Sequence, residues 1–569
     1  MRTTVARWWR IGVGLGCLSF ALHPYDAVAT AAINPQVTYM ATVNDGSVIQ
    51  YAITDMAVDR AGNVWLVGGT TSKTLPVTDD AFDKLFVPED FDEGFVLELD
   101  PSGALVYASY IGGSLFDGAG GIAIDGDGNV YIAGTTISID FPVTPGAFQT
   151  ALASAPSAED AFLVKLDSSG RLLASTYFGG NNRDLYPAGG RGFPGAAVAV
   201  ASDGSVYLAG GTASTDLPTS GGYQQQYGGG TQDVFLAKFT SSLAFERCTY
   251  LGGDNNEGAY RVEVDGSDNV YLLGAAARIL GQPWTFPVTS GAYLTAPSGD
   301  PLMFLTKFDP SGALAYATFL GPAAGDGMLF ESQGDLAVDR AGNAYVVGVT
   351  GSATYPTTPG AFQTNLRGFS DLFVSKLDPT GAMLLYSTYF GGSAAEYSNE
   401  EAGVRIAVNE QGNAYIVGLT DSGDLPEKQS FSSTKSGRFI AKLDPTGTDL
   451  IYSSFFPSPN FGPDALALAP ARAGDGAAGA SGATVFAAGP KIDPPGVAVL
   501  GIDENAPPSC PADCDGDGFV HVNDLLTGVR IALEQALLSE CESFDSDGDK
   551  RVSVAELVRA VGTLLRGCA

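Results

Sequence analysis

Two twelve-residue segments near the C-terminus carry oxygen-bearing side chains at the spacing that a calcium ion requires. They are DCDGDGFVHVND at 513–524 and DSDGDKRVSVAE at 545–556. Ca2+ takes six to eight oxygen ligands, and a loop of this length supplies them from positions 1, 3, 5, 7, 9 and 12. In the first loop these positions hold Asp513, Asp515, Asp517, the main-chain carbonyl of Phe519, His521 acting through water, and Asp524. In the second loop they hold Asp545, Asp547, Asp549, the main-chain carbonyl of Arg551, Ser553 and Glu556.

The two loops differ at position 6, where the chain must turn sharply. Gly518 suits this turn, whereas Lys550 strains it, so we expect the second loop to bind Ca2+ more weakly. An Asp/Gly-rich solvated turn is the alternative. Each loop is, however, followed by an apolar segment with helical periodicity, LLTGVRIALEQAL or LVRAVGTLL, which favours a pair of calcium loops.

The loops begin 32 residues apart, and each precedes a predicted helix. This arrangement resembles a type I dockerin, a duplicated EF-hand-like module. Asp524 at position 12 is similar to a dockerin, and Glu556 is similar to an ordinary EF-hand. The resemblance implies calcium-dependent attachment to a cohesin-like protein partner. A cell-surface polysaccharide is the other partner that we consider.

Catalytic groups are scarce elsewhere in the chain. After removal of a predicted leader the only histidine is His521, so Ser-His-Asp chemistry and histidine-ligated zinc are effectively excluded. Cys248 has no histidine to activate it and is expected to be a buried structural cysteine. Carboxylates that do not recur between repeats could run glycoside hydrolysis or could be solvated loop charges. These are Glu257, Asp326, Glu396, Glu400 and Glu401.

The elements that would position these groups form a repeat of about 70 residues over 36–503. Each unit predicts a β-hairpin, a proline-containing loop, a third strand and a fourth strand, as in GNVYIAGTT, DFPVTPGAFQT, DAFLVKLD and STYFGG. Acidic residues recur at the hairpin turn and after the third strand, which predicts roles in turns rather than in catalysis. They are Asp59, Asp125, Asp265 and Asp339 at the first position, and Asp100, Asp167, Asp309, Asp378 and Asp444 at the second.

The two ends of the repeat region complement each other. Residues 37–45 align with a fourth strand that has no preceding partners, and residues 497–503 align with a third strand that has no fourth. The N-terminal strand should therefore complete the last unit and close a ring, which removes exposed sheet edges. The sequence predicts an all-β, seven-bladed propeller followed by a small all-α calcium domain.

The ordered motifs listed for the repeat resemble the SBBP repeat, a bacterial seven-bladed β-propeller repeat, over most of residues 36–503. The resemblance implies the propeller fold and export. It implies no particular activity, because one fold carries many functions.

The chain also has the features of an exported protein. Residues 1–31 contain three arginines, an apolar run of about 12 residues and small residues before the expected cleavage point, which predicts a secretory signal rather than a membrane anchor.

The remainder of the chain holds 27 basic and 62 acidic residues, a net charge of −35, which disfavours binding to nucleic acid and anionic membranes. Four cysteines close to the C-terminus predict two disulfides in one of three pairings, among Cys510, Cys514, Cys541 and Cys568.

The predicted organisation is therefore a signal peptide at 1–31, a propeller at 36–503, a linker at 504–509 and a calcium-binding domain at 510–569. The sequence favours a secreted or cell-surface, non-catalytic binding or scaffold protein that has Ca2+ as its cofactor and no transmembrane segment after signal cleavage. The alternative is a carbohydrate-active enzyme, an O-glycosyl hydrolase that degrades polysaccharide and carries a dockerin.

Overall fold

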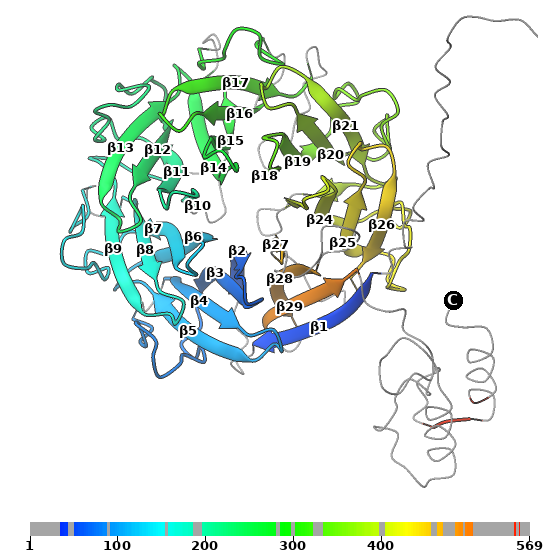
Figure 1. The fold of residues 1–569 in the computed structure, drawn as a ribbon, viewed down its shortest axis with the longest axis horizontal. Helices are drawn as coiled ribbons and strands as arrows, with labels where there is room; N and C mark the ends of the chain where they lie inside the picture. The colour runs from blue at the N-terminus through cyan, green and yellow to red at the C-terminus, as the bar shows by residue number, and fades with distance from the viewer. Residues whose placement is uncertain are drawn as a thin grey trace, which may run out of the picture. The chain divides into compact units, whose positions relative to one another are not determined.

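The computed structural model describes most of the predicted propeller and little of the tail (Figure 1). The described residues are 35–43, 51–87, 91–153, 158–185, 196–279, 285–296, 302–322, 334–397, 404–456, 464–469, 484–492, 495–504, 551–553 and 557. They form seven antiparallel sheets, arranged as blades around a common axis. In blades 1 to 5 the strands run from the inner to the outer edge in chain order.

The first four blades have the same four-stranded order. Blade 1 contains β2 (Tyr51–Val58), β3 (Val64–Thr70), β4 (Glu93–Leu99) and β5 (Leu105–Ile111). Blade 2 contains β6 (Asp117–Ile124), β7 (Val130–Thr136), β8 (Asp160–Leu166) and β9 (Leu172–Phe178). Blade 3 contains β10 (Ala197–Val200), β11 (Val206–Thr212), β12 (Asp233–Phe239) and β13 (Phe245–Leu251). Blade 4 contains β14 (Asn256–Val264), β15 (Val270–Ala277), β16 (Leu302–Phe308) and β17 (Leu314–Leu320).

Blade 5 keeps this order, whereas blades 6 and 7 vary it. Blade 5 contains β18 (Gly334–Val338), β19 (Ala344–Thr350), β20 (Asp371–Leu377) and β21 (Leu384–Phe390). In blade 6 two short inner strands, β22 (Glu396–Tyr397) and β23 (Arg405–Val408), both pair with β24 (Ala414–Thr420), which is followed by β25 (Gly437–Leu443) and β26 (Leu450–Phe455). Blade 7 contains β27 (Ala465–Leu468), β28 (Thr484–Ile492), β29 (Pro495–Asp503) and, as its outer strand, β1 (Gln36–Val43).

The pairing of β1 with β29 closes the ring. The two strands are antiparallel and pair from Gln36 opposite Asp503 to Val43 opposite Val497, with a register shift between Val37 and Tyr39. Because the first described strand of the chain thus completes the last blade, neither end of the propeller leaves an unpaired sheet edge. The structure confirms the predicted seven blades and their closure by the N-terminal strand.

The second strand of a blade is the most buried, because neighbouring blades cover both of its faces. All seven residues are buried in β3, β7, β11 and β19. Their apolar, β-branched and aromatic residues suit a two-sided core. The hydrophobic core therefore lies in the seams between blades, and the large side chains fully buried there are mainly tyrosines, among them Tyr131, Tyr271, Tyr345 and Tyr415.

The hairpin turn between the first two strands requires a residue with positive φ. Glycine supplies it in most blades, as at Gly342 with φ of 81°, whereas in blade 4 Asp268 adopts φ of 60°. Aspartate is one of the few other residues that tolerate this region. The hairpin therefore keeps its form where the repeated glycine is absent.

Little of the predicted all-α calcium domain falls within the described residues. There, the Leu557 N–H donates a hydrogen bond of 3.1 Å to the Ser553 carbonyl, the spacing of one helical turn. Across the described part of the chain, no helix is long and apolar enough to cross a membrane.

Candidate functional site

Most of the residues that the sequence nominates as calcium ligands lie outside the described residues. Of the two loops, only Arg551 and Ser553 are described, together with Val552 between them. The signal segment, most of the linker and the four C-terminal cysteines also lie outside. The candidate site that the structure can describe is therefore in the ring.

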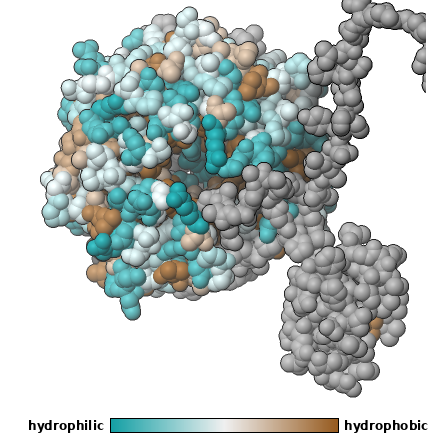
Figure 2. Space-filling model, viewed as in Figure 1, coloured by the Kyte–Doolittle hydropathy of each residue, from teal (hydrophilic) through white to brown (hydrophobic). Residues whose placement is uncertain are grey.

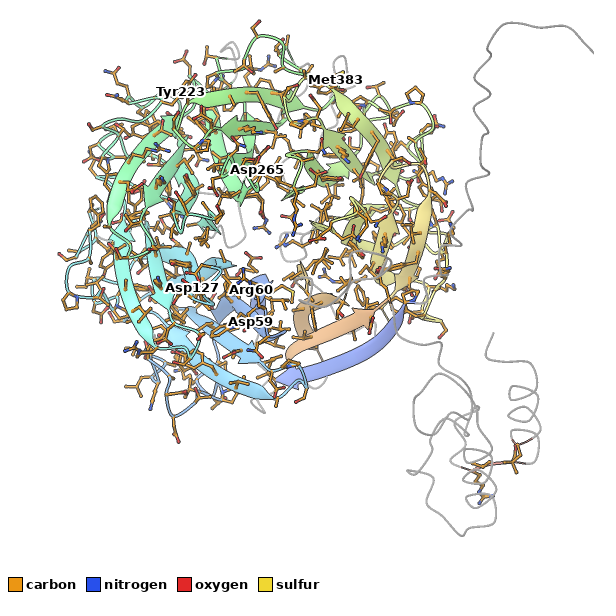
Figure 3. The ribbon with its side chains drawn as sticks, viewed as in Figure 1. Asp59, Arg60, Asp127, Tyr223, Asp265 and Met383 are labelled. Atoms are coloured by element: carbon orange, nitrogen blue, oxygen red, sulfur yellow. The ribbon has the colours of Figure 1, made fainter. Side chains whose placement is uncertain are left out.

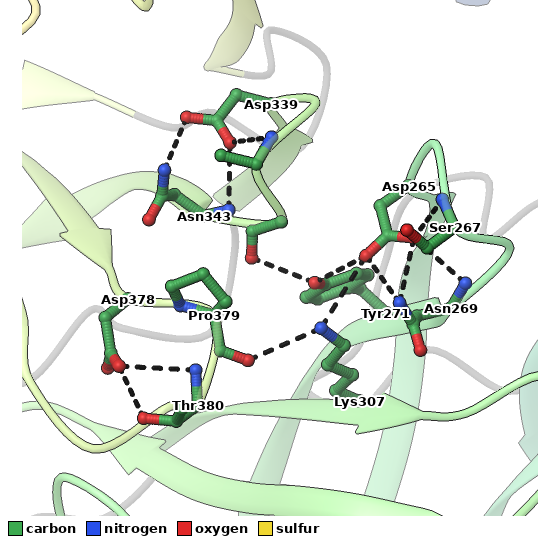
Figure 4. A network of polar contacts seen from close by, with 12 residues as sticks. Asp265, Ser267, Asn269, Tyr271, Lys307, Asp339, Asn343, Asp378, Pro379 and Thr380 are labelled. Carbon is green, nitrogen blue, oxygen red and sulfur yellow. Dashed lines mark hydrogen bonds and ion pairs between the residues drawn. The ribbon is translucent and has the colours of Figure 1, made fainter.

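The acidic residues that recur from blade to blade have a structural role, as their repetition predicted. Asp265 in the blade 4 hairpin accepts hydrogen bonds from the main-chain N–H groups of Ser267 and Asn269, at 2.9 and 3.0 Å (Figure 4). The Tyr271 hydroxyl donates to the same carboxylate at 3.0 Å. Lys307 Nζ lies 3.6 Å from Asp265 and 4.8 Å from the centre of the Tyr271 ring.

This network also joins one blade to the next. The Tyr271 hydroxyl lies 2.9 Å from the carbonyl oxygen of Gly342 in the blade 5 hairpin, and Lys307 Nζ donates to the Pro379 carbonyl at 3.4 Å (Figure 4). Equivalent tyrosine and lysine pairs occur as Tyr131 with Lys165, Tyr345 with Lys376 and Tyr415 with Lys442. These charges hold the ring together and are not free for catalysis.

Around the inner edge of the ring the hairpin turns of neighbouring blades also touch. Figure 3 shows Asp59, Arg60 and Asp127 at the inner ends of blades 1 and 2, and Tyr223 at the rim. The Arg60 guanidinium donates to the Gly126 carbonyl of the next blade at 2.9 Å. On the face shown in Figure 2, hydrophilic residues surround a hollow at the centre of the ring.

Blade 1 departs from the tyrosine and lysine pattern. Trp65 and Glu98 occupy the positions that tyrosine and lysine hold in other blades, as their pairing shows. Glu98 is only 3% exposed, and burial together with the nearby Asp59 charge raises its pKa to about 7. Ionising this buried carboxylate should therefore destabilise the ring above neutral pH.

Two carboxylates were expected in loops, either as solvated charges or lining one face of the ring. In the structure both are buried on strands. Glu257 is the second residue of β14 and Glu396 the first of β22, and both are 0% exposed. Glu396 accepts hydrogen bonds from the Gly392 N–H, Thr420 and Ser422, at 2.9, 3.0 and 2.7 Å. They are sealed between blades because the glycine-rich ends of the outer strands bring the chain back against the next blade. Asp326, Glu400 and Glu401 lie outside the described residues.

Cys248 is a buried free thiol in β13, as expected. It is 0% exposed, and burial raises its pKa far above the usual value. It is therefore unsuited to be a nucleophile.

Charged residues that do not recur from blade to blade meet on the innermost strands. We call Asp55, Arg261, Glu263, Asp335 and Arg405 the central charged cluster. Arg261 of blade 4 forms an ion pair with Asp335 of blade 5. Arg405 of blade 6 donates to the Thr54 carbonyl of blade 1 at 3.2 Å, although blade 7 lies between these blades in the ring order. The cluster therefore reaches across the axis of the propeller.

Main-chain groups fix the two aspartates of the cluster. The Ile122 N–H of blade 2 donates to Asp55 at 3.1 Å, and the Ile406 N–H of blade 6 donates to Asp335 at 2.9 Å. Each aspartate thus accepts a hydrogen bond from the inner strand of the next blade. The aspartates are held in place on strands, which is the arrangement that a preorganised site requires.

Burial sets the charge of the cluster. It lowers the pKa of Arg405 to about 10, with a further contribution from the Arg261 charge, so Arg405 stays protonated near neutral pH. Burial raises the pKa of Glu263 to about 8, and the Asp335 and Asp55 charges add to the rise. It also raises the pKa of Asp55. Two guanidinium groups near carboxyl groups can recognise an anion, and Glu263 can hold or release a proton near neutral pH.

A sequence signal for this cluster exists, although the sequence did not lead us to it. Four of its members occupy one repeat position, the residue just before the hairpin motif, as the strand registers show. Blades 2 and 3 have Gly121 and Ala197 at this position. A charged residue at a position of the inner strand where blades 2 and 3 have a small residue thus marks four members of the cluster. They are Asp55, Arg261, Asp335 and Arg405.

Comparisons with known proteins agree with the fold. Residues 106–142 match the family model SBBP, described as beta-propeller repeat. No match is found among curated proteins. Solved structures that are similar to this chain include a protein of unknown function from Dyadobacter fermentans DSM 18053, at 8% identity and a TM-score of 0.40, covering 83% of this chain and 100% of that one. They also include polysaccharide lyase Uly1, at 9% identity and a TM-score of 0.42, covering 82% and 99%.

A europium-containing methanol dehydrogenase is similar at 10% identity, with a TM-score of 0.35 and coverage of 83% and 94%. The seven closed blades and the repeat match together identify the chain as a β-propeller repeat protein with an SBBP repeat at residues 106–142.

Proposed function

We propose that this chain is an exported, non-catalytic binding or scaffold protein. In this proposal the closed ring presents its loops and its central charged cluster to a ligand, and a calcium-loaded tail attaches the ring to a protein partner or a surface. The observation that carries the proposal is the fate of the candidate catalytic carboxylates: Glu257 and Glu396 are both 0% exposed between blades. A group sealed in this way cannot reach a substrate.

The central charged cluster favours an anionic ligand for this binding role, such as a polysaccharide that carries carboxylate or sulfate groups. Planar guanidinium groups bind such anions through paired hydrogen bonds. Arg405 donates from both terminal nitrogens to main-chain carbonyls, whereas its Nε has no partner among the described residues. We therefore expect Arg405 to be the residue whose loss weakens ligand binding most.

The tail supports the attachment role through its sequence alone. Its two loops place oxygen ligands for Ca2+ from Asp513 to Asp524 and from Asp545 to Glu556. A chain this acidic, exported by residues 1–31, would meet the high calcium concentration outside the cell. Calcium titration of the full chain should lose about one site with Asp513→Asn and about one weaker site with Asp545→Asn.

A carbohydrate-active enzyme is the second candidate, and one observation favours it. Glu263 has a pKa of about 8, so it is a carboxylic acid near neutral pH, and Asp335 is held in an ion pair nearby on the inner strands. A protonated and an ionised carboxyl group are what glycoside hydrolysis needs. Polysaccharide turnover that Glu263→Gln abolishes would establish this candidate and overturn the binding proposal.

The test of the binding proposal is an affinity measurement on acidic and neutral polysaccharides with the full chain. We expect saturable binding to an acidic polysaccharide, weakened at least about tenfold by Arg405→Gln, with no release of new saccharide ends. Arg340→Gln, which removes an exposed arginine of the blade 5 hairpin, is the matched control. Equal affinity of the wild type and both variants would contradict a role for the central charged cluster.

A further inference from the structure

Two carboxylates face each other, fully buried, in the seam between blades 3 and 4. Asp233 begins β12 and Glu257 is the second residue of β14, and both are 0% exposed. The Glu257 N–H donates to the Gln232 carbonyl at 3.0 Å, so the main chain clamps the two strands together at this point. The pair is therefore built into the seam rather than brought there by flexible side chains.

Each carboxylate has one oxygen satisfied and one without a partner. Asp233 Oδ2 accepts from the Gly228 N–H at 2.5 Å, and Glu257 Oε2 accepts from the Gly253 N–H at 3.2 Å. Among the described residues, Asp233 Oδ1 and Glu257 Oε1 have no hydrogen-bond partner. Within the described part of the chain, no lysine or arginine forms an ion pair with either residue. Two buried carboxylates without a counterion are strongly unfavourable.

A glycine makes room for this pair. A Cβ atom on Gly252 would lie 3.0 Å from Glu257 Oε2 and closer still to Asp233 Oδ1, so no larger residue fits there. Both carboxylates thus approach the same point of the chain. Burial raises the pKa of Asp233 to about 7 and that of Glu257 to about 8, and the Asp233 charge adds to the rise at Glu257.

Other seams of the same ring show that the pair is not required by the fold. Between blades 4 and 5, β16 begins with Leu302 and the outer strand is followed by Gly321 and Pro322 instead of two glycines. Between blades 6 and 7 the chain supplies its own cation, because Arg438 lies 3.0 Å from Asp464. Among the seams that hold carboxylate, this one thus receives a protein cation, whereas the seam between blades 5 and 6 supplies Asp371 and Glu396 with several hydrogen-bond donors.

The seam between blades 1 and 2 repeats the arrangement. Glu93 and Asp117 are both 0% exposed, flank Gly112 and each have one oxygen without a partner. The recurrence of two buried carboxylates beside the same glycine indicates a built feature rather than a local accident.

We propose that Asp233 and Glu257 bind a divalent cation, of which Ca2+ is the best match, in the seam between blades 3 and 4. The two carboxylates offer up to four oxygens, and main-chain carbonyls and water complete the coordination that Ca2+ prefers. The ion replaces the missing protein cation and fastens blade 3 to blade 4. This site is separate from the predicted loops at 513–524 and 545–556.

The test measures Ca2+ bound per chain by equilibrium dialysis and the melting temperature at pH 8, with Ca2+ or with EDTA, on the full chain. Asp233→Asn with Glu257→Gln should bind about one ion fewer than the wild type. Ca2+ should raise the melting temperature of the wild type by at least about 2 °C more than that of the variant. Asp254→Asn removes an exposed carboxylate that lies nearby and should bind as many ions as the wild type.

Terbium luminescence provides a second readout that does not depend on the stability of the variant. The charges of Asp233 and Glu257 act on Tyr227, whose ring centre lies 5.8 Å from that of Tyr250. Residues 510–569 contain no tyrosine or tryptophan. Terbium excited through tyrosine should therefore report the seam and not the tail, and Tyr227→Phe should reduce the signal without reducing the number of ions bound.

Three outcomes would overturn the proposal. Equal numbers of bound ions in the wild type and the double variant would mean that the pair holds no metal. Loss of an ion in Asp254→Asn as well would mean adventitious surface binding only. A melting temperature that rises as the pH falls from 9 to about 6, with no effect of Ca2+ or EDTA, would mean that the two carboxyl groups share a proton instead.

Discussion

At the scale of single residues, the acids of the ring fall into two groups according to their surroundings. Although burial opposes it, hydrogen bonds from Asn343 and Tyr345 hold the pKa of Asp339 below its usual value. Burial with few donors instead raises the pKa of Glu98. The first group stabilises the ring when ionised, and the second destabilises it when ionised.

Glu98→Gln should stabilise the chain at pH 8 and change little at pH 4. The pKa of Glu98 is raised to about 7 in the folded ring, so ionising it costs stability as the pH rises from the unfolded pKa to the folded one. The gain at pH 8 should be up to about 3 kcal/mol. Thermal unfolding at the two pH values measures it, with the exposed Glu410→Gln as the control. An equal effect at both pH values would show that the charge is not the cause.

Tyr271→Phe should destabilise the ring by about 1–2 kcal/mol, because the Asp265 carboxylate and the Gly342 carbonyl lose a buried donor. Tyr223 is 47% exposed at the rim, so Tyr223→Phe should have almost no effect. Urea unfolding of the full chain compares the two variants. Equal midpoints for both would mean that the hydroxyl contributes nothing across the seam.

At the scale of elements, the hairpin between the first two strands depends on one acidic cap. Asp339 accepts hydrogen bonds from the main-chain N–H groups of Ala341 and Asn343, at 3.0 and 2.9 Å. In blade 6 Asn409 fills the same position and accepts from the Asn413 N–H at 2.9 Å. An uncharged acceptor therefore suffices for the turn itself.

Asp339→Ala should lower the stability by about 1–2 kcal/mol, and Asp339→Asn should lower it less. The stability difference between the wild type and Asp339→Asn should shrink as the pH falls well below 4, because the folded pKa of Asp339 is depressed and the contribution of its carboxylate is lost on protonation. Thermal unfolding against pH tests this order. A larger loss for the asparagine variant would contradict a role of the residue as a hydrogen-bond acceptor.

The element order could be predicted from the sequence, whereas the burial of particular carboxylates could not. The repeated motifs fix strand order and closure, because each copy gives the same pattern independently. Glu257 and Glu396 look like ordinary loop acids in the sequence, and only the return of the outer strand against the next blade seals them. The central charged cluster was missed because four of its members, Asp55, Arg261, Asp335 and Arg405, lie on four different blades, about 70 or more residues apart along the chain.

At the scale of the whole molecule, stability depends on closing the ring. β1 is the outer strand of blade 7 and pairs with β29 along its full length. A chain that lacks residues 36–43 should expose the edge of β29, melt at a lower temperature and associate through that edge. Size-exclusion chromatography and thermal unfolding would reveal this. A truncated chain that stays monomeric with an unchanged melting temperature would show that closure is dispensable.

The recurring and the non-recurring charges of the ring have different roles. Recurring charges fasten neighbouring blades, and the central charged cluster is the described set of charges that departs from the repeat. A ring of this kind can offer a fixed surface while loops and tail vary. On this basis we propose recognition, rather than catalysis, as the role of the chain.

The most direct test is one assay that reads both binding and cleavage of an acidic polysaccharide by the full chain in the presence of Ca2+. Our account predicts that protein is depleted from solution by the polysaccharide, that Arg405→Gln reduces the depletion, and that no new saccharide ends appear. New ends that accumulate with time and disappear in Glu263→Gln would contradict it.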